Sequence, residues 1–306
     1  MEPDVRTGSA VVFPGMGPSS FADVARFMLI NPAARKLVKA ADEVLGYSLV
    51  DRYRENDGDY SEYAQVAFFV NCLALAGEGL DPEVCTGPSF GGKMAAVYSG
   101  ALSFDDGVWM TSRWARCLDE YFAEEHGELI THSFARTPPE RLGEILAELD
   151  ARGTWHEISC HVDDDFTMLT LGQNELEWLE KRLRQAGGLP LYSMYPPMHA
   201  SVFAPLREKM ENEVFRELTF SDPALPVIAD QDGAVLETGA QVREMLLDGL
   251  VRAVRWPDVV AALKARGIGR LDVAGPDRLF GRVPCTTRNF EVVRHDPRSA
   301  TRPRRR

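Results

Sequence analysis

Strand-like and helix-like hydrophobic patterns alternate along the first part of the chain. Short segments at 9–13 and 83–86, each followed by a turn rich in glycine and proline, are typical of buried strands. Apolar residues at helical spacing predict helices over 21–46, interrupted at Pro32, and over 62–77, 91–100 and 104–125. Strands that are followed by helices indicate a parallel sheet with helices on both faces.

The pattern changes between residues 127 and 196. Apolar runs predict strands over 128–135, 155–162, 165–172 and 189–195, and helical spacing predicts helices over 138–153 and 174–188. This βαββαβ order is typical of a ferredoxin-like subdomain. Because it lies inside the chain, we expect one large α/β subdomain built from residues 1–126 and 197–293, with the small subdomain 127–196 inserted.

Composition narrows the function classes. The chain has 306 residues, 45% hydrophobic and 26% charged, which is ordinary for a globular protein. Its net charge of −12 argues against binding to nucleic acid or to an anionic membrane, since both need a positive field. The basic end at 294–306 lacks a hydrophobic period, so we expect a disordered tail.

Targeting signals and cysteine spacing indicate the compartment. No apolar run reaches the roughly 20 residues of a membrane span, and the acidic start lacks the features of a signal peptide. The five cysteines are scattered without a C-x-x-C pair, which argues against a disulfide framework or a zinc site and for a reducing cytoplasm.

The segment GPSFG at 87–91 contains a candidate nucleophile, Ser89. A strand-like segment precedes it and small residues follow it, which is the steric profile of a nucleophile elbow. A plain strand–turn–helix connection fits the same residues. A serine hydroxyl needs a neighbouring base to attack, so a histidine partner would separate the two interpretations.

Six histidines are available as that base. His199 follows the inserted subdomain directly, where the chain re-enters the large one, so it can face a cleft between the two; a structural role is the alternative. His161 with Asp163–Asp165 resembles a set of metal ligands, but no second cluster completes a site. We interpret that acidic segment as a hairpin turn and expect no metal.

An ordered series of motifs resembles the malonyl-CoA:acyl carrier protein transacylase family, including polyketide synthase acyltransferases. FPGMG is similar to the family's F-P-G-Q-G, GPSFGG to G-H-S-x-G-E, and PPMHAS to its P-x-H-S segment. YAQVAFF, PVIADQDGAVL and VRAVRW match further segments in the same order. The resemblance implies an α/β-hydrolase-like large subdomain with an inserted ferredoxin-like one.

The same resemblance implies a Ser–His dyad. Ser89 would carry the acyl group as an ester and His199 would act as the base in a ping-pong reaction. The backbone carbonyl of Gly249 would orient the imidazole. The backbone N–H groups of Met16 and Phe90 would form the oxyanion hole.

The chain departs from the family in its acyl pocket. Malonyl-type members carry an arginine that clamps the free carboxylate, and that position falls on Trp114, with Arg113 beside it. Met198 precedes the histidine where malonyl-selective members have H-A-F-H. These differences indicate a larger acyl group, aminoacyl or dipeptidyl, as in the stand-alone acyltransferases of macrolactam polyketide pathways.

The resemblance also implies the partners. Donor and acceptor would be acyl carrier proteins, and the acyl-phosphopantetheine thioester would arrive on the partner, with no cofactor bound permanently. Candidate docking residues are Arg136, Arg278 and Arg282, each of which fits an ordinary solvated surface equally well. Two alternatives stay open: a malonyl-CoA:acyl carrier protein transacylase, and an editing hydrolase on the same fold.

Overall fold

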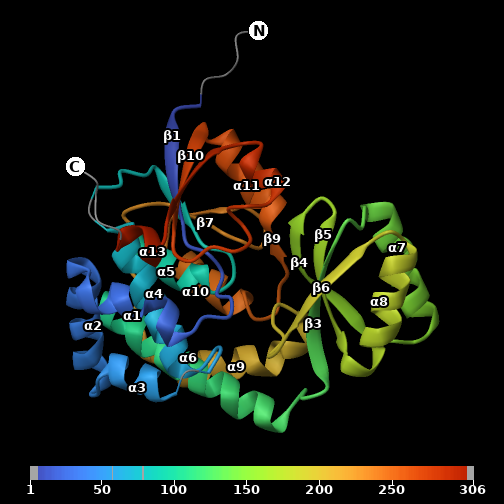
Figure 1. Ribbon diagram of the computed structural model, residues 1–306, viewed down its shortest axis with the longest axis horizontal. Helices are drawn as coiled ribbons and strands as arrows, with labels where there is room; N and C mark the ends of the chain where they lie inside the picture. The colour runs from blue at the N-terminus through green and yellow to red at the C-terminus, as the bar shows by residue number, and fades with distance from the viewer. Residues whose placement is uncertain (1–5, 57, 78, 302–306) are drawn as a thin grey trace.

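The computed structural model describes residues 6–56, 58–77 and 79–301 and has two lobes. Figure 1 shows the large lobe, which holds both the N-terminal and the C-terminal part of the chain, beside a small lobe made from the middle of the chain. Each lobe has its own sheet, of six strands in the large lobe and five in the small one. Among these residues, no helix combines the length and apolar character that crossing a membrane requires.

The large sheet has the strand order β11-β10-β1-β2-β7-β8. Neighbouring strands are parallel except for the final hairpin between β7 and β8. Ala10, Val11 and Val12 are fully buried, as expected for a strand that is covered on both faces. The strands are β1 (Gly8–Val12), β2 (Val84–Thr86), β7 (Val227–Ile228), β8 (Val235–Leu236), β10 (Ile268–Ala274) and β11 (Glu291–His295).

Helices cover this sheet and confirm most of the predicted segments. The break expected at Pro32 is the start of a second helix, because Pro32 occupies its first turn and the Asn31 side chain caps it. The helices of the large lobe are α1 (Phe21–Ile30), α2 (Pro32–Leu45), α3 (Leu49–Glu55), α4 (Glu62–Ala76), α5 (Gly91–Tyr98), α6 (Phe104–Glu124), α9 (Ala204–Glu213), α10 (Gly239–Asp248), α11 (Trp256–Ala265), α12 (Pro284–Thr287) and α13 (Pro297–Ala300).

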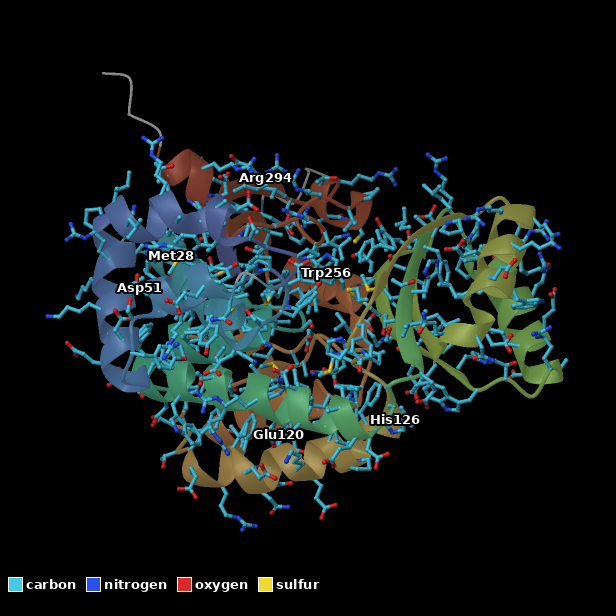
Figure 2. The ribbon with its side chains drawn as sticks, turned by 60° about the horizontal axis from the view of Figure 1, so that its bottom comes forward. Met28, Asp51, Glu120, His126, Trp256 and Arg294 are labelled. Carbon is cyan, nitrogen blue, oxygen red and sulfur yellow. The ribbon has the colours of Figure 1, made fainter. Side chains whose placement is uncertain are left out.

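Helix α6 leads the chain from the large lobe to the small one. Figure 2 shows Glu120 on α6 near α9, and His126 where the chain passes into the small lobe. Glu120 accepts a salt bridge from Lys209 of α9 at 3.0 Å. Helices α6 and α9 therefore pack against each other near the point where the chain enters the small lobe.

The small lobe confirms the predicted βαββαβ order. Its strands lie in the order β6-β3-β5-β4, with antiparallel neighbours, which is the ferredoxin-like arrangement. The short strand β9 (Val254–Arg255) adds to the edge of β4 and ties the small lobe to the large one. The elements are β3 (Leu129–Ala135), α7 (Pro139–Ala151), β4 (His156–Asp163), β5 (Phe166–Gly172), α8 (Leu176–Gln185) and β6 (Leu189–Met194).

The C-terminal segment differs from the prediction of a disordered tail. Strand β11 ends at His295, whose Nε2 lies 2.8 Å from a carboxylate oxygen of Asp272, and α13 follows it. Arg298 then donates a hydrogen bond to Asp23 of α1 at 2.8 Å. The prediction was wrong for 294–301 because these partners lie far away in the sequence; residues 302–306 lie outside the described residues.

Candidate active site

Ser89 stands in a tight turn between β2 and α5. Its φ of 57° is in the left-handed region, which serine rarely adopts. The glycines on both sides are required by close backbone approach: a Cβ on Gly87 would collide with the backbone of Gly91, and a Cβ on Gly91 would collide with the carbonyl of Phe13. The G-x-S-x-G pattern thus has the geometry of a nucleophile elbow, in place of an ordinary connection.

His199, which follows the inserted lobe in the sequence, lies next to this serine. The Oγ atom of Ser89 lies 2.8 Å from Nε2 of His199. His199 also has a left-handed φ, 65°, and its backbone N–H donates to the carbonyl of Leu250 at 3.0 Å. Two strained residues from separate segments are therefore held in hydrogen-bond contact, which is the arrangement that a serine nucleophile and its base need.

The surroundings of His199 favour its neutral form. Burial lowers the pKa of His199 to about 4, while the backbone of Gly249 acts in the opposite direction. Within the described part of the chain, Nδ1 has no hydrogen bond of ordinary geometry, but the backbone of Gly249 lies close enough to raise the pKa of His199. The orienting role of the Gly249 carbonyl stays a prediction. A neutral imidazole at pH 7 can accept a proton from Ser89.

Asp230 is a site residue that sequence reasoning missed. Its Oδ2 accepts the backbone N–H of Ser89 at 2.6 Å, and its side chain is 4% exposed. Burial raises the pKa of Asp230 to about 7. The signal was available: an acidic residue two positions after the end of β7 lies at the carboxyl edge of the sheet, where β2 also ends.

The predicted oxyanion hole consists of the backbone N–H groups of Met16 and Phe90. Met16 and Phe90 line the same cavity as Ser89 and His199. Among the described residues, neither backbone N–H has an acceptor. A Cβ on Gly15 would lie 3.8 Å from Cβ of Ser89, so the loop that carries Met16 packs directly against the nucleophile turn. Both donors can hold an oxyanion without breaking an existing bond.

The cavity at Ser89, of about 160 Å³, lies between the lobes and is called here the Ser89 cavity. Thr131, Ser159, Met168 and Met194 line it from the small lobe. From the large-lobe segments come Trp114, Lys93, Met198, Asp119 and Gln231.

Of the three residues predicted to bind the acyl group, the structure places two in the Ser89 cavity. Trp114 and Met198 line the Ser89 cavity, and Trp114 packs edge-on against Phe215 with ring centroids 5.8 Å apart. Arg113 is absent from the described lining, and its charge acts on Cys117 and Glu213. The assignment of Arg113 to substrate binding is therefore corrected. One residue along a helix turns a side chain by about 100°, which directs Arg113 away from the cavity.

The three candidate docking arginines, Arg136, Arg278 and Arg282, are all exposed. Arg136 follows β3 with a φ of 59°. Arg278 acts electrostatically on Tyr60, which lines the Ser89 cavity, although Arg278 itself is not part of the described lining. Arg282 donates to the backbone carbonyl of Asp277 at 2.9 Å, which holds its side chain against its own loop.

The acidic segment after His161 forms the turn between β4 and β5, as predicted. Asp163 accepts the backbone N–H groups of Asp164 and Cys285 at 2.9 and 3.1 Å. Its carboxylate therefore fixes the hairpin and a neighbouring loop.

Comparisons with known proteins agree with this fold. Residues 133–194 match the family model described as the VinK acyltransferase small domain. The chain is 26% identical over 296 residues to the malonyl CoA-acyl carrier protein transacylase of Bacillus subtilis, covering 93% of this chain and 92% of that protein. It is also 26% identical over 277 residues to the polyketide biosynthesis protein ThaF of Burkholderia thailandensis, covering 87% of this chain and 23% of that protein.

Solved structures show the same architecture over both lobes. One match is a chain in the solved structure PlMCAT:AntF, a type II polyketide synthase acyl carrier protein in complex with its malonyl-transacylase. The TM-score is 0.84 at 21% identity, and the match covers 96% of this chain and 98% of that chain. FabD from Acinetobacter baumannii also matches with a TM-score of 0.84, at 20% identity, covering 96% of each chain. The predicted α/β fold is therefore confirmed.

Proposed function

Because the chain belongs to the malonyl-CoA:acyl carrier protein transacylase family, we propose that it transfers an acyl group between carrier-protein thiols by way of an ester on Ser89. The observation that carries the proposal is the 2.8 Å contact between Oγ of Ser89 and Nε2 of His199, at the wall of a cavity that both lobes line. The fold by itself would not settle the chemistry.

The first half-reaction loads the serine. Nε2 of His199 takes the hydroxyl proton of Ser89 as Oγ attacks the thioester carbonyl, and the backbone N–H groups of Met16 and Phe90 hold the resulting oxyanion. When the intermediate collapses, the C–S bond breaks and the leaving thiolate takes the proton from the imidazolium. An acyl ester on Ser89 and a free carrier thiol remain.

The second half-reaction transfers the acyl group from Ser89 to the acceptor. An acceptor thiol gives its proton to Nε2 of His199 and attacks the ester carbonyl, so that a C–S bond forms. The C–O bond to Ser89 then breaks, and the serine oxygen recovers the proton. Because the neutral form of His199 is favoured, the base is ready for both halves at neutral pH.

The cargo that we propose is an aminoacyl or dipeptidyl group, as in macrolactam polyketide biosynthesis. Trp114, at the position of the family's carboxylate-binding arginine, offers an apolar face in the Ser89 cavity, and Met198 adds a flexible apolar wall. The match of residues 133–194 to the VinK acyltransferase small domain supports acyl transfer and leaves the acyl group to be tested. Donor and acceptor are carrier proteins whose phosphopantetheine arm reaches Ser89.

Transfer can be tested with purified carriers. Donor carriers loaded with malonyl, aminoacyl or dipeptidyl groups are mixed with the enzyme, with and without an unloaded acceptor carrier, and the carrier masses are followed. We expect the acceptor to gain the mass of the aminoacyl or dipeptidyl group. Free acid released equally fast with and without the acceptor would identify a hydrolase, and faster transfer of malonyl would refute the assignment of the cargo.

A further inference from the structure

Lys93 lies in the first turn of α5, one turn beyond the nucleophile. Its side chain is 3% exposed, and it lines the Ser89 cavity together with Ser89, Phe90 and Trp114. The sequence GGK at 91–93 carried no signal that this lysine would point inward. Lysine is among the residues that are almost never fully buried unless they are paired.

The amino group of Lys93 has no polar partner within the described chain. Its Nζ is buried without a hydrogen bond and makes no salt bridge. Two aromatic rings hold it instead, with Nζ 4.4 Å from the ring centre of Phe90 and 4.3 Å from that of Trp114. Aromatic faces attract a cation but accept little of its hydrogen-bonding capacity.

An unpaired buried amine lowers the stability of a fold. Burial lowers the pKa of Lys93 well below its usual value, because its charge loses hydration and gains no counter-ion. Methionine would fill the same space without this penalty. Sites where a sequence breaks a folding rule without local compensation are characteristically functional.

We propose that Lys93 anchors an oxygen acceptor on the acyl group, and so does from α5 what the absent arginine would do from α6. This inference rests on the proposed function, because it assigns a ligand to the same cavity. The flexible stem of lysine lets Nζ turn from the two rings toward an oxygen in the cavity. A carboxylate and an amide carbonyl share this chemistry, and a plain alkyl chain lacks it.

The Ser89 cavity also holds an acidic side chain apart from Lys93. Lys93 is buried between the rings of Phe90 and Trp114, whereas Asp119 lines the same cavity with an exposed side chain and has no salt bridge among the described residues. An ammonium group would be attracted to the carboxylate of Asp119, whereas the Lys93 amine carries no negative charge that could attract it. A dipeptidyl chain meets both conditions when its amide carbonyl reaches Lys93 and its amino end reaches Asp119.

Binding measurements separate this inference from the transfer chemistry. Malonyl, N-acetyl-β-alanyl and hexanoyl pantetheine thioesters are titrated by calorimetry into Ser89→Ala protein, which cannot be acylated. The first two carry a carboxylate and an amide carbonyl, and the third carries neither. The titrations are repeated with Ser89→Ala/Lys93→Met and with the control Ser89→Ala/Lys39→Met, which changes a lysine on the surface helix α2.

We expect Lys93→Met to lower the affinity for at least one oxygen-bearing thioester, relative to hexanoyl, by tenfold or more, and Lys39→Met to leave that ratio unchanged. The thioester that loses most identifies the acceptor as carboxylate or amide. An unchanged ratio in Lys93→Met protein, with circular dichroism showing an intact fold, would overturn the inference. If the ratio shifts but the wild-type chain transfers no acyl group, Lys93 keeps its role and the proposed function fails.

Discussion

The molecule contains two partly buried Ser–His pairs with the same spacing and different surroundings. Ser89 Oγ lies 2.8 Å from Nε2 of His199, and Ser193 Oγ lies 2.8 Å from Nδ1 of His132. Each histidine has one ring nitrogen without a hydrogen-bonding partner among the described residues, and burial lowers the pKa of both. Distance and protonation alone do not distinguish the two pairs.

What differs is the backbone and the space around each serine. His132 and Ser193 are registered neighbours on the antiparallel strands β3 and β6, and neither lines the Ser89 cavity. Ser89 stands instead on a strained turn beside two unpaired backbone donors. A Ser–His hydrogen bond becomes a candidate catalytic site only where a substrate carbonyl can approach and its oxyanion can be held.

The largest expected difference is between the two serines. Ser89→Ala should lower the transfer rate by about 10⁴-fold or more, because no acyl ester can form. Ser193→Ala removes an exposed hydroxyl and should leave the rate within about twofold. Rates are measured by the mass gained by an acceptor carrier. A comparable loss in both variants would remove the distinction between the pairs.

The second largest expected difference is between the transfer rates of the two histidine variants. His199→Gln should slow transfer by about 10³-fold through loss of the general base. His132→Gln should lower stability but leave the rate per folded molecule nearly unchanged. In wild-type protein with labelled histidines, NMR should show the His199 ring neutral from pH 7 down to about pH 4. A ring that is already protonated at pH 6 would contradict this description of the base.

Asp230 gives a pH-dependent prediction for stability. Burial raises the pKa of Asp230 in the folded protein to about 7, above its ordinary value of 3.8. Protonation therefore favours the folded state, and this contribution is present below pH 3.8 and is lost as the pH rises through 7. Relative to wild type, Asp230→Asn should gain stability between pH 4 and 7 by up to about 1.4 kcal/mol per pH unit.

Chemical denaturation at several pH values measures this difference. Asp164→Asn, an exposed position in the β4–β5 turn, serves as the control and should show a difference from wild type that changes little with pH. If the Asp230→Asn curve ran parallel to that of wild type, the carboxylate beneath Ser89 would not titrate as described.

The smallest effect concerns carrier docking. Arg278→Ala should lower kcat/KM for a carrier-bound donor by about threefold at low salt, and the difference should fade as salt is added, because an exposed arginine contributes a screened attraction. Arg35→Ala on α2, exposed and away from the cavity, is the matched control. A loss that is independent of salt would argue for a structural role of Arg278.

Local patterns predicted most of the elements, because their causes are local. The βαββαβ segment follows from apolar spacing and turns alone. Short or late strands were missed: β9 and β11 exist through their pairing with β4 and β10, and such partners leave no periodic signal in so few residues.

The site was predictable to the extent that motifs carried it. Ser89 and His199 stand in recognisable segments, and the structure brings them together. The direction of Lys93, the turn of Arg113 away from the cavity, and the bond from Ser89 to Asp230 depend on how distant segments pack. These features need three-dimensional contacts, which a single sequence does not display.

The most direct test of the central claim is to locate the acyl group on the protein. The enzyme is mixed with a loaded donor carrier without acceptor, quenched in acid, digested and analysed by tandem mass spectrometry. We expect the added mass on Ser89 and none on Ser193. Transfer that proceeds while the mass is found on another residue, or on none, would contradict the account.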